Sequence, residues 1–149
     1  MIQSFWQEFL SSQNLELPLP NAWMFGDETK EMGDSLGQLV LDGIKTATCS
    51  AYDLYQMEGE ALPTVGQYDI ILNGDREPIA VIQTIAVSLV KMKDVTPEFA
   101  KKEGEGDLSY RYWFDIHEEF FTKSFQQIGL TVDTEKQLVC EEFKVLYKK

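Results

Sequence analysis

The segment Pro78-Ile-Ala-Val-Ile-Gln-Thr-Ile-Ala-Val-Ser-Leu-Val90 decides the fold, because it is the longest run of β-forming residues in the chain. Isoleucine and valine recur through it, and β-branched side chains favour extended backbone. A strand of this length indicates a small, curved barrel rather than an open parallel sheet. A second strand pattern at 67–73 precedes it, and only a turn around Asn73-Gly-Asp75 separates the two. These strands are therefore expected to pair antiparallel.

Helical patterns surround these strands. Apolar residues with helical spacing predict an N-terminal helix over about 2–12, and the prolines at 18 and 20 end it. Further elements are predicted as a short strand at 22–25, a helix at 29–42 stopped by Gly43, a strand at 46–50, a helical turn at 52–60, a short helix at 94–103 with Thr96 as its cap, a long helix at 108–128 and a last strand at 139–147. The prediction is one α+β domain over 1–149, with a small β-barrel of about five to six strands and flanking helices.

The chain is strongly acidic. It has 149 residues with 13 Lys and Arg against 25 Asp and Glu, which gives a formal net charge of −12. A broad basic face for a phosphate backbone is excluded, because long-range repulsion would oppose the encounter. A focused pocket for one nucleoside or a few nucleotides remains compatible with this charge.

No targeting or membrane segment is expected. The start, Met1-Ile-Gln-Ser-Phe-Trp-Gln-Glu8, lacks the basic residues of a signal peptide. The most hydrophobic segment, 79–90, is interrupted by polar residues and is too short to span a bilayer. Cys49 and Cys140 lie far apart without metal-type spacing, so reduced thiols in a cytoplasmic protein are predicted.

The stretch Gly43-Ile-Lys45-Thr-Ala-Thr48 lies where a helical pattern stops and a strand pattern starts. Lys45 is a candidate amine base and Thr48 a candidate hydroxyl nucleophile. Residues three apart on a regular strand point to opposite faces, so the pair converges only if Lys45 still belongs to the turn. The plainer interpretation is a solvated lysine at a helix C-terminus and a threonine that suits a strand.

Glu103 is a candidate third member, because a carboxylate beside Lys45 would orient the amine or carry a proton to a leaving group. Its plainer role is a surface charge at a helix end. Glu105 and Asp107 resemble hard-cation ligands, but their spacing matches no calcium loop. Asp107 is predicted to be the N-cap of the long helix.

No metal or cofactor is predicted. His117 is the only histidine, and a zinc site normally uses more than one. A Cys49–His117 dyad is conceivable, although Cys49 is expected to pack in the core. The chain has neither a phosphate-binding loop nor a dinucleotide fingerprint.

Several aromatic side chains lie near predicted turns. Trp23, Tyr52 and Tyr55 are candidates to stack on a nucleobase, while the other aromatic residues fit core positions. Thr46, beside Lys45, joins them as a candidate substrate-binding residue.

Five blocks in order resemble one known family. They are Trp23-Met-Phe-Gly-Asp27, Leu39-Val-Leu-Asp-Gly-Ile-Lys-Thr-Ala-Thr48, Val65-Gly-Gln-Tyr68, Glu103-Gly-Glu-Gly-Asp-Leu-Ser-Tyr-Arg-Tyr-Trp113 and Val139-Cys-Glu-Glu-Phe143. From about residue 20 to its end, the chain resembles the ASCH domain family, whose fold is similar to the PUA β-barrel. The longer bacterial subgroup, with an extra N-terminal helix, is the best match.

The resemblance implies a function. The family was proposed to bind RNA, one bacterial member has been reported as a ribonuclease, and some smaller members remove the acetyl group from N4-acetylcytidine with a Lys, a Thr and a Glu. These roles carry over to Lys45, Thr48 and Glu103. The expected ligand is a small nucleoside, with short single-stranded RNA as the alternative. The inserted helix at 108–128 departs from the small amidohydrolases and is expected to reshape the pocket.

Overall fold

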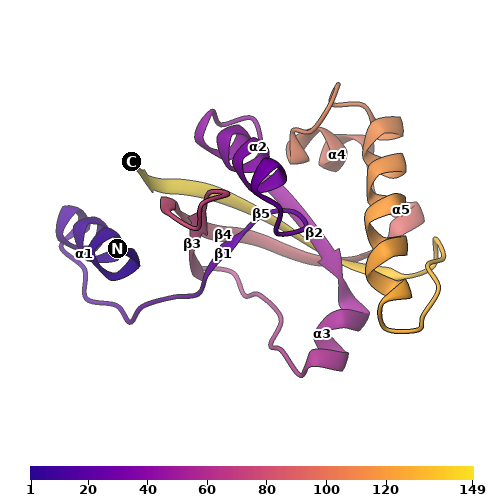
Figure 1. Ribbon diagram of the computed structural model, residues 1–149, viewed down its shortest axis with the longest axis horizontal. Coiled ribbons are helices and arrows are strands. Elements are labelled where there is room, and N and C mark those ends of the chain that lie inside the picture. Colours follow the sequence, from indigo (N-terminus) through magenta and orange to yellow (C-terminus); the bar gives the residue numbers. More distant parts are fainter.

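The computed structural model describes residues 1–149 and is organised around one five-stranded sheet, in the order β1-β3-β4-β5-β2 (Figure 1). The strands are β1 (Ala22–Met24), β2 (Ala47–Ala51), β3 (Tyr68–Leu72), β4 (Pro78–Lys91) and β5 (Gln137–Lys148). Strand β3 pairs antiparallel with β4, as predicted, whereas β1 runs parallel to β3. The α+β class is confirmed. The sheet has five strands, the lower of the two predicted numbers.

The long strands β4 and β5 give the sheet its curvature. Their register shifts twice, between Val81 and Ile82 and between Thr84 and Ala86. Such bulges bend a strand and increase its twist. The edge strands β1 and β2 do not pair with each other, so the sheet is barrel-like without being closed.

Helices cover the sheet at several places. They are α1 (Ile2–Gln13), α2 (Lys30–Leu41), α3 (Tyr52–Glu58), α4 (Pro97–Glu103) and α5 (Tyr110–Gln126), with a 3-10 turn, η1 (Met92–Asp94), after β4. In Figure 1, α1 and α5 lie at opposite ends of the molecule and α2 lies between them. None of these helices has an apolar stretch of the length needed to span a lipid bilayer.

Helix caps explain where α4 and α5 begin. The Thr96 side chain accepts a hydrogen bond from the backbone N–H of Phe99, as predicted from its position before a proline. The predicted cap of the long helix is wrong: Ser109, not Asp107, accepts from the N–H of Tyr112. The Asp107 carboxylate instead accepts from the N–H of Ser109. This bond closes a turn that precedes the capping residue Ser109.

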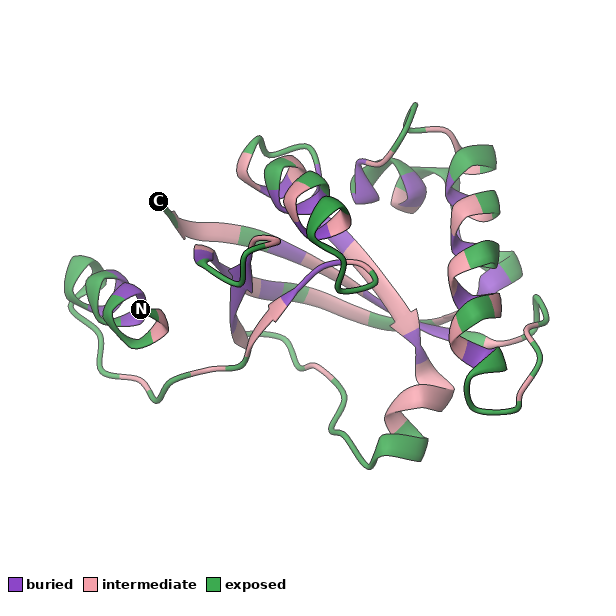
Figure 2. Ribbon diagram, viewed as in Figure 1, coloured by how far each residue is buried: buried purple, intermediate pink, exposed green.

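The core consists of three apolar clusters. Figure 2 shows the buried residues in purple. Helix α1 buries Phe5, Trp6, Phe9 and Leu10 against the sheet in one cluster, and α5 buries Trp113, Phe121 and Phe125 in another. The third joins α2 to the sheet through Leu36, Val40, Phe25 and Phe143. Each large buried side chain stabilises the fold by about 1.5–3 kcal/mol. The clusters beneath α5 and α2 flank the candidate active site.

Candidate active site

Lys45 lies in the turn after α2 and not in a regular strand. Gly43 adopts a positive φ of 75°, and the backbone N–H groups of Ile44 and Lys45 both donate to the carbonyl of Leu39, at 3.0 and 3.1 Å. Lys45 therefore lies in the turn, before β2 begins at Ala47. Its side chain is directed inward, and only 2% of the residue is exposed.

The buried Lys45 ammonium group is held by two carboxylates. Its Nζ lies 3.1 Å from Glu103 Oε1, 3.3 Å from the Glu103 carbonyl and 3.0 Å from Glu105 Oε2. The ring of Phe25 lies 5.3 Å from the same nitrogen. Burial opposes the positive charge, but the two carboxylates outweigh it, so the pKa of Lys45 is raised above its usual value. The amine is consequently a cation in this arrangement.

Glu103 is the centre of the cluster. Its Oε2 accepts from Trp113 Nε1 at 2.6 Å and from Cys49 Sγ at 3.2 Å, and it lies 3.3 Å from His117 Nε2. Burial would raise the pKa of this carboxyl group, but the positive charge of Lys45 and the bonds from His117 and Trp113 lower it to about 2. Glu103 is therefore a fixed anion.

A glycine brings the two halves of the cluster together. Gly104 ends α4 with a φ of 74°, and a Cβ there would lie 2.6 Å from the carbonyl oxygen of Ile44. Only a residue without a side chain permits this approach of the α4–α5 loop to the turn that carries Lys45. The sequence suggested Glu103 as a partner of Lys45 but could not bring the two residues together, and this contact explains how they meet.

His117 fixes the other side of Glu103. Its Nδ1 lies 2.7 Å from the carbonyl of Trp113, so Nδ1 carries a proton and donates. Burial lowers the pKa of His117, but the Glu103 carboxylate outweighs burial and the pKa is raised. Trp113 and His117 are four residues apart on one face of α5, a spacing that could have indicated a shared partner. The sequence suggested a Cys49–His117 pair, but it did not indicate that both side chains contact Glu103.

One cavity of about 560 Å³ lies beside this buried cluster and is lined by it. Its walls come from the loop after β1, from α2 and from α5, and six polar residues face it at its base: Lys45, Thr48, Cys49, Glu103, Glu105 and His117. Thr48 thus shares the cavity with Lys45 and Glu103, although its hydroxyl makes no hydrogen bond to either. The arrangement combines a hydroxyl, an amine and anchored carboxylates at one surface, which suits acid–base and acyl-transfer chemistry.

The four candidate binding residues lie elsewhere. Trp23 donates from Nε1 to Asp69 Oδ1 at 3.0 Å, and the Tyr55 hydroxyl lies 2.9 Å from Ser50 Oγ. Thr46 Oγ1 is bonded to the carbonyl of Lys102, and Tyr52 begins α3. None of Trp23, Thr46, Tyr52 and Tyr55 lines the cavity. The cavity presents Phe25 and Phe120 as its aromatic surfaces instead.

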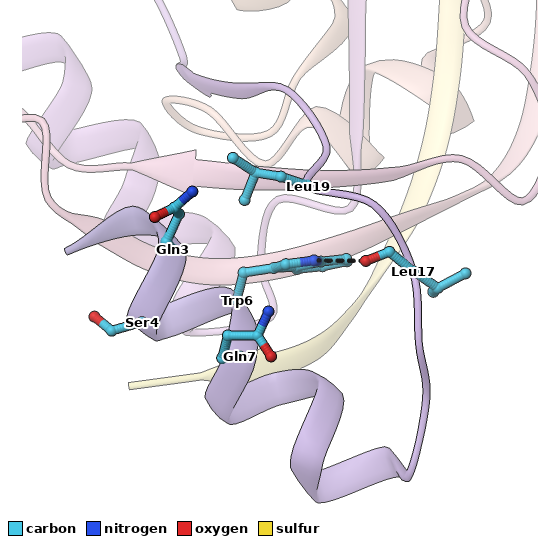
Figure 3. Close-up of a pocket in the computed structure, with 6 residues that line it drawn as sticks. All are labelled: Gln3, Ser4, Trp6, Gln7, Leu17 and Leu19. Carbon is cyan, nitrogen blue, oxygen red and sulfur yellow. Dashed lines mark hydrogen bonds between the residues drawn. The ribbon is translucent and has the colours of Figure 1, made fainter.

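A second hollow, of about 420 Å³, lies beside α1 (Figure 3). Its lining is Gln3, Ser4, Trp6, Gln7, Leu17 and Leu19, and Trp6 Nε1 donates to the Leu17 carbonyl across it. No ionisable side chain lines it, so the first cavity is the candidate active site.

Comparisons with known proteins agree with this fold. The family model of the ASCH domain matches residues 21–147. The chain belongs to the ASCH domain family. A crystal structure of protein EF3133 from Enterococcus faecalis V583 matches with 45% identity and a TM-score of 0.91, covering 97% of this chain and 86% of that one.

A crystal structure of an ASCH domain from Lactobacillus crispatus JV V101 matches with 32% identity and a TM-score of 0.90, covering 97% of this chain and 93% of that one. A search of curated proteins gives no match. The ASCH fold is thus shared over nearly the whole length, including α1.

Proposed function

We propose that this ASCH protein is an amidohydrolase that removes the acyl group from a small nucleoside of the N4-acetylcytidine type. The observation that carries the proposal is that Lys45, Thr48 and Glu103 line one cavity, with Lys45 and Glu103 in direct contact. The cavity volume of about 560 Å³ suits a ligand of nucleoside size. The resemblance of these three residues to those of the smaller ASCH amidohydrolases supplies the substrate class.

The chemistry proceeds by acyl transfer. The Thr48 hydroxyl attacks the amide carbonyl carbon while neutral Lys45 accepts the hydroxyl proton. The C–N bond then breaks, and the Lys45 ammonium returns that proton to the exocyclic nitrogen of the nucleoside. Water cleaves the acetyl–Thr48 ester, which releases acetate and regenerates the hydroxyl. Glu103 holds Lys45 in place throughout.

Lys45 needs a trigger to become a base, because two carboxylates hold it as a cation. Glu105 is the more accessible partner: 14% of its side chain is exposed, against 2% for Glu103, and it lines the cavity. A substrate that displaces Glu105 from Lys45 leaves the amine with one carboxylate instead of two. Substrate entry therefore favours transfer of the Lys45 proton to solvent, which leaves the neutral amine.

The charge of the cavity indicates an uncharged substrate. Its acidic lining residues are Asp27, Glu103, Glu105 and Glu119, whereas its basic ones are Lys45 and Lys123. This excess of acid opposes a phosphate backbone, as does the net charge of −12. A free nucleoside is favoured over RNA for this reason.

The test is incubation with N4-acetylcytidine and chromatographic measurement of cytidine and acetate. Lys45→Ala and Thr48→Val should each lower kcat by about 10²–10⁴-fold, the usual contribution of a base or nucleophile. Lys102→Ala is the matched control, because Lys102 pairs with Glu142 at the surface next to Glu103 and should retain full activity. Absence of turnover in the wild-type protein would reject this substrate, and a complex with single-stranded RNA in a gel shift would favour the binding alternative.

A further inference from the structure

We propose that Cys49, Glu103 and His117 form a binding site for one divalent zinc ion at the base of the cavity. The Sγ, Oε2 and Nε2 atoms of these residues all lie within 4.8 Å of one another. Sγ lies 3.2 Å and Nε2 lies 3.3 Å from Oε2. Ligand atoms around tetrahedral zinc, with bonds of about 2.0–2.3 Å, are about 3.3–3.7 Å apart. Small side-chain shifts would therefore complete the ligand triangle.

The donor set suits zinc. A thiolate, an imidazole and a carboxylate are its three usual protein ligands, and sites with three such ligands keep a fourth position for water or substrate. All three residues face the cavity, which provides both the entry path and the fourth position. The sequence predicts no metal site because only one histidine is present, but the fold adds two ligands to that histidine.

His117 is already oriented as a metal ligand. Its Nδ1–H donates to the carbonyl of Trp113, which leaves Nε2 as the coordinating nitrogen. Carbonyl bonds of this kind hold metal-binding histidines in one tautomer and one ring orientation. The stacking of His117 on Trp113, with ring centroids 4.5 Å apart, restricts the ring further.

Glu103 also has the capacity for a metal bond. Its Oε2 has two lone pairs. The short bond from Trp113 takes one of them, and the longer contacts from Cys49 and His117 converge on the other. A cation at that position would coordinate Sγ, Nε2 and Oε2 together, while Oε1 continues to bind Lys45.

The protons balance in this step. Zinc binding displaces the thiol proton of Cys49 and any proton on His117 Nε2, and both pass to solvent. The ion's two positive charges then replace the charges of these protons, so the buried cluster gains little net charge. No change of oxidation state is involved.

The test is titration of the chelator-treated protein with Co²⁺, followed by competition with Zn²⁺. We expect one equivalent to give the near-ultraviolet thiolate-to-cobalt band and the visible bands of tetrahedral cobalt, which Zn²⁺ then removes. Cys49→Ser should abolish the thiolate band, and His117→Ala should weaken binding at least about 100-fold. Cys140→Ser is the matched control, because Cys140 lies opposite Cys49 on β5 but outside the cluster, and it should bind as wild type does.

Absence of the thiolate band at saturating Co²⁺, or a band that persists in Cys49→Ser, would overturn the proposal. Circular dichroism of each variant identifies any loss of binding that comes from unfolding. The readout is spectroscopic and needs no substrate. It therefore stands or fails separately from the proposed amide hydrolysis.

Discussion

Cys49 and Cys140 lie directly opposite each other on the antiparallel strands β2 and β5. Three residues away in the same register, the N–H of Phe143 donates to the carbonyl of Thr46 at 3.0 Å. Hydrogen-bonded and non-hydrogen-bonded pairs alternate along such strands, so Cys49 and Cys140 form a non-hydrogen-bonded pair. Their Cα atoms are then about 4.5 Å apart, at the lower end of the range that a disulfide spans. Both are free thiols in this structure.

Prolonged oxidation is expected to join these two thiols, but slowly, because burial raises the pKa of both and disulfide exchange needs the thiolate. Treatment with oxidised glutathione should remove both thiols from a thiol-reagent assay and lower the protein mass by two hydrogens. The bond takes Cys49 away from Glu103, so acylnucleoside hydrolysis should fall and recover after addition of dithiothreitol. Cys140→Ser should keep its activity in oxidant. A Cys49–glutathione adduct in place of the internal bond would contradict the strand geometry.

Replacing Glu105 should increase activity. Glu105→Gln removes one of the two carboxylates that hold the proton on Lys45, so the amine loses that proton more readily. We expect kcat/KM for N4-acetylcytidine at neutral pH to rise several-fold. Glu119→Gln, which changes another acidic residue of the cavity lining without touching Lys45, should have little effect. Equal increases in both variants would point to the cavity charge in general rather than to the Lys45 contact.

Gly104 should be far less tolerant of a side chain than Gly59. Gly104→Ala places a Cβ 2.6 Å from the Ile44 carbonyl, so the loop must move away from Lys45. Gly59 is the matched control, because it has a similar φ of 66° but no atom within 4 Å of its Cβ position. Strain at positive φ costs each variant about 1 kcal/mol. In urea unfolding, the free energy of unfolding should fall by about 1–3 kcal/mol more in Gly104→Ala than in Gly59→Ala.

Glu141 should make stability depend on pH. Burial and the charge of Asp69 raise its pKa from 4.5 to about 7, so the folded protein favours the protonated form. The contribution of protonated Glu141 to the free energy of unfolding is fully present below pH 4.5 and is lost as pH rises through about 7. Glu141→Gln should therefore raise the free energy of unfolding at pH 8 relative to pH 5 by about 1–3 kcal/mol, a value reduced for partial solvent access.

Urea unfolding of the wild type and of Glu141→Gln at both pH values measures this difference. Glu142→Gln is the control, because that neighbouring carboxylate pairs with Lys102 at the surface. It should keep the pH dependence of the wild type. An unchanged dependence in Glu141→Gln would assign the effect to another group.

The elements could be predicted because each one has a local pattern. Alternating and continuous apolar runs indicated β3 and β4, and helical spacing indicated α1 and α5. The cap of α5 was missed because Asp107 and Ser109 are both good capping residues two positions apart, and only backbone geometry distinguishes them. Closure of the sheet depends on whether its two edge strands meet, which no local pattern records.

The site was predictable in part. Lys45, Thr48 and Glu103 do line one cavity, and the turn after Gly43 that lets Lys45 and Thr48 reach it is present. Trp23 and Tyr55 instead bond to polar partners outside the cavity, because proximity to a turn does not determine the direction of a side chain. The meeting of Cys49, Trp113 and His117 at Glu103 depends on how α4 packs against both β2 and α5, which are distant parts of the chain.

The two walls of the cavity belong to different apolar clusters. Phe25 and Leu36 are anchored in the cluster under α2, whereas Phe120 packs on the cluster under α5. The base of the cavity is coupled to only one of these walls, because Trp113 and His117 of α5 both contact Glu103. A shift of α5 would therefore disturb the charged cluster, whereas the α2 side can adjust to a ligand without moving these two contacts.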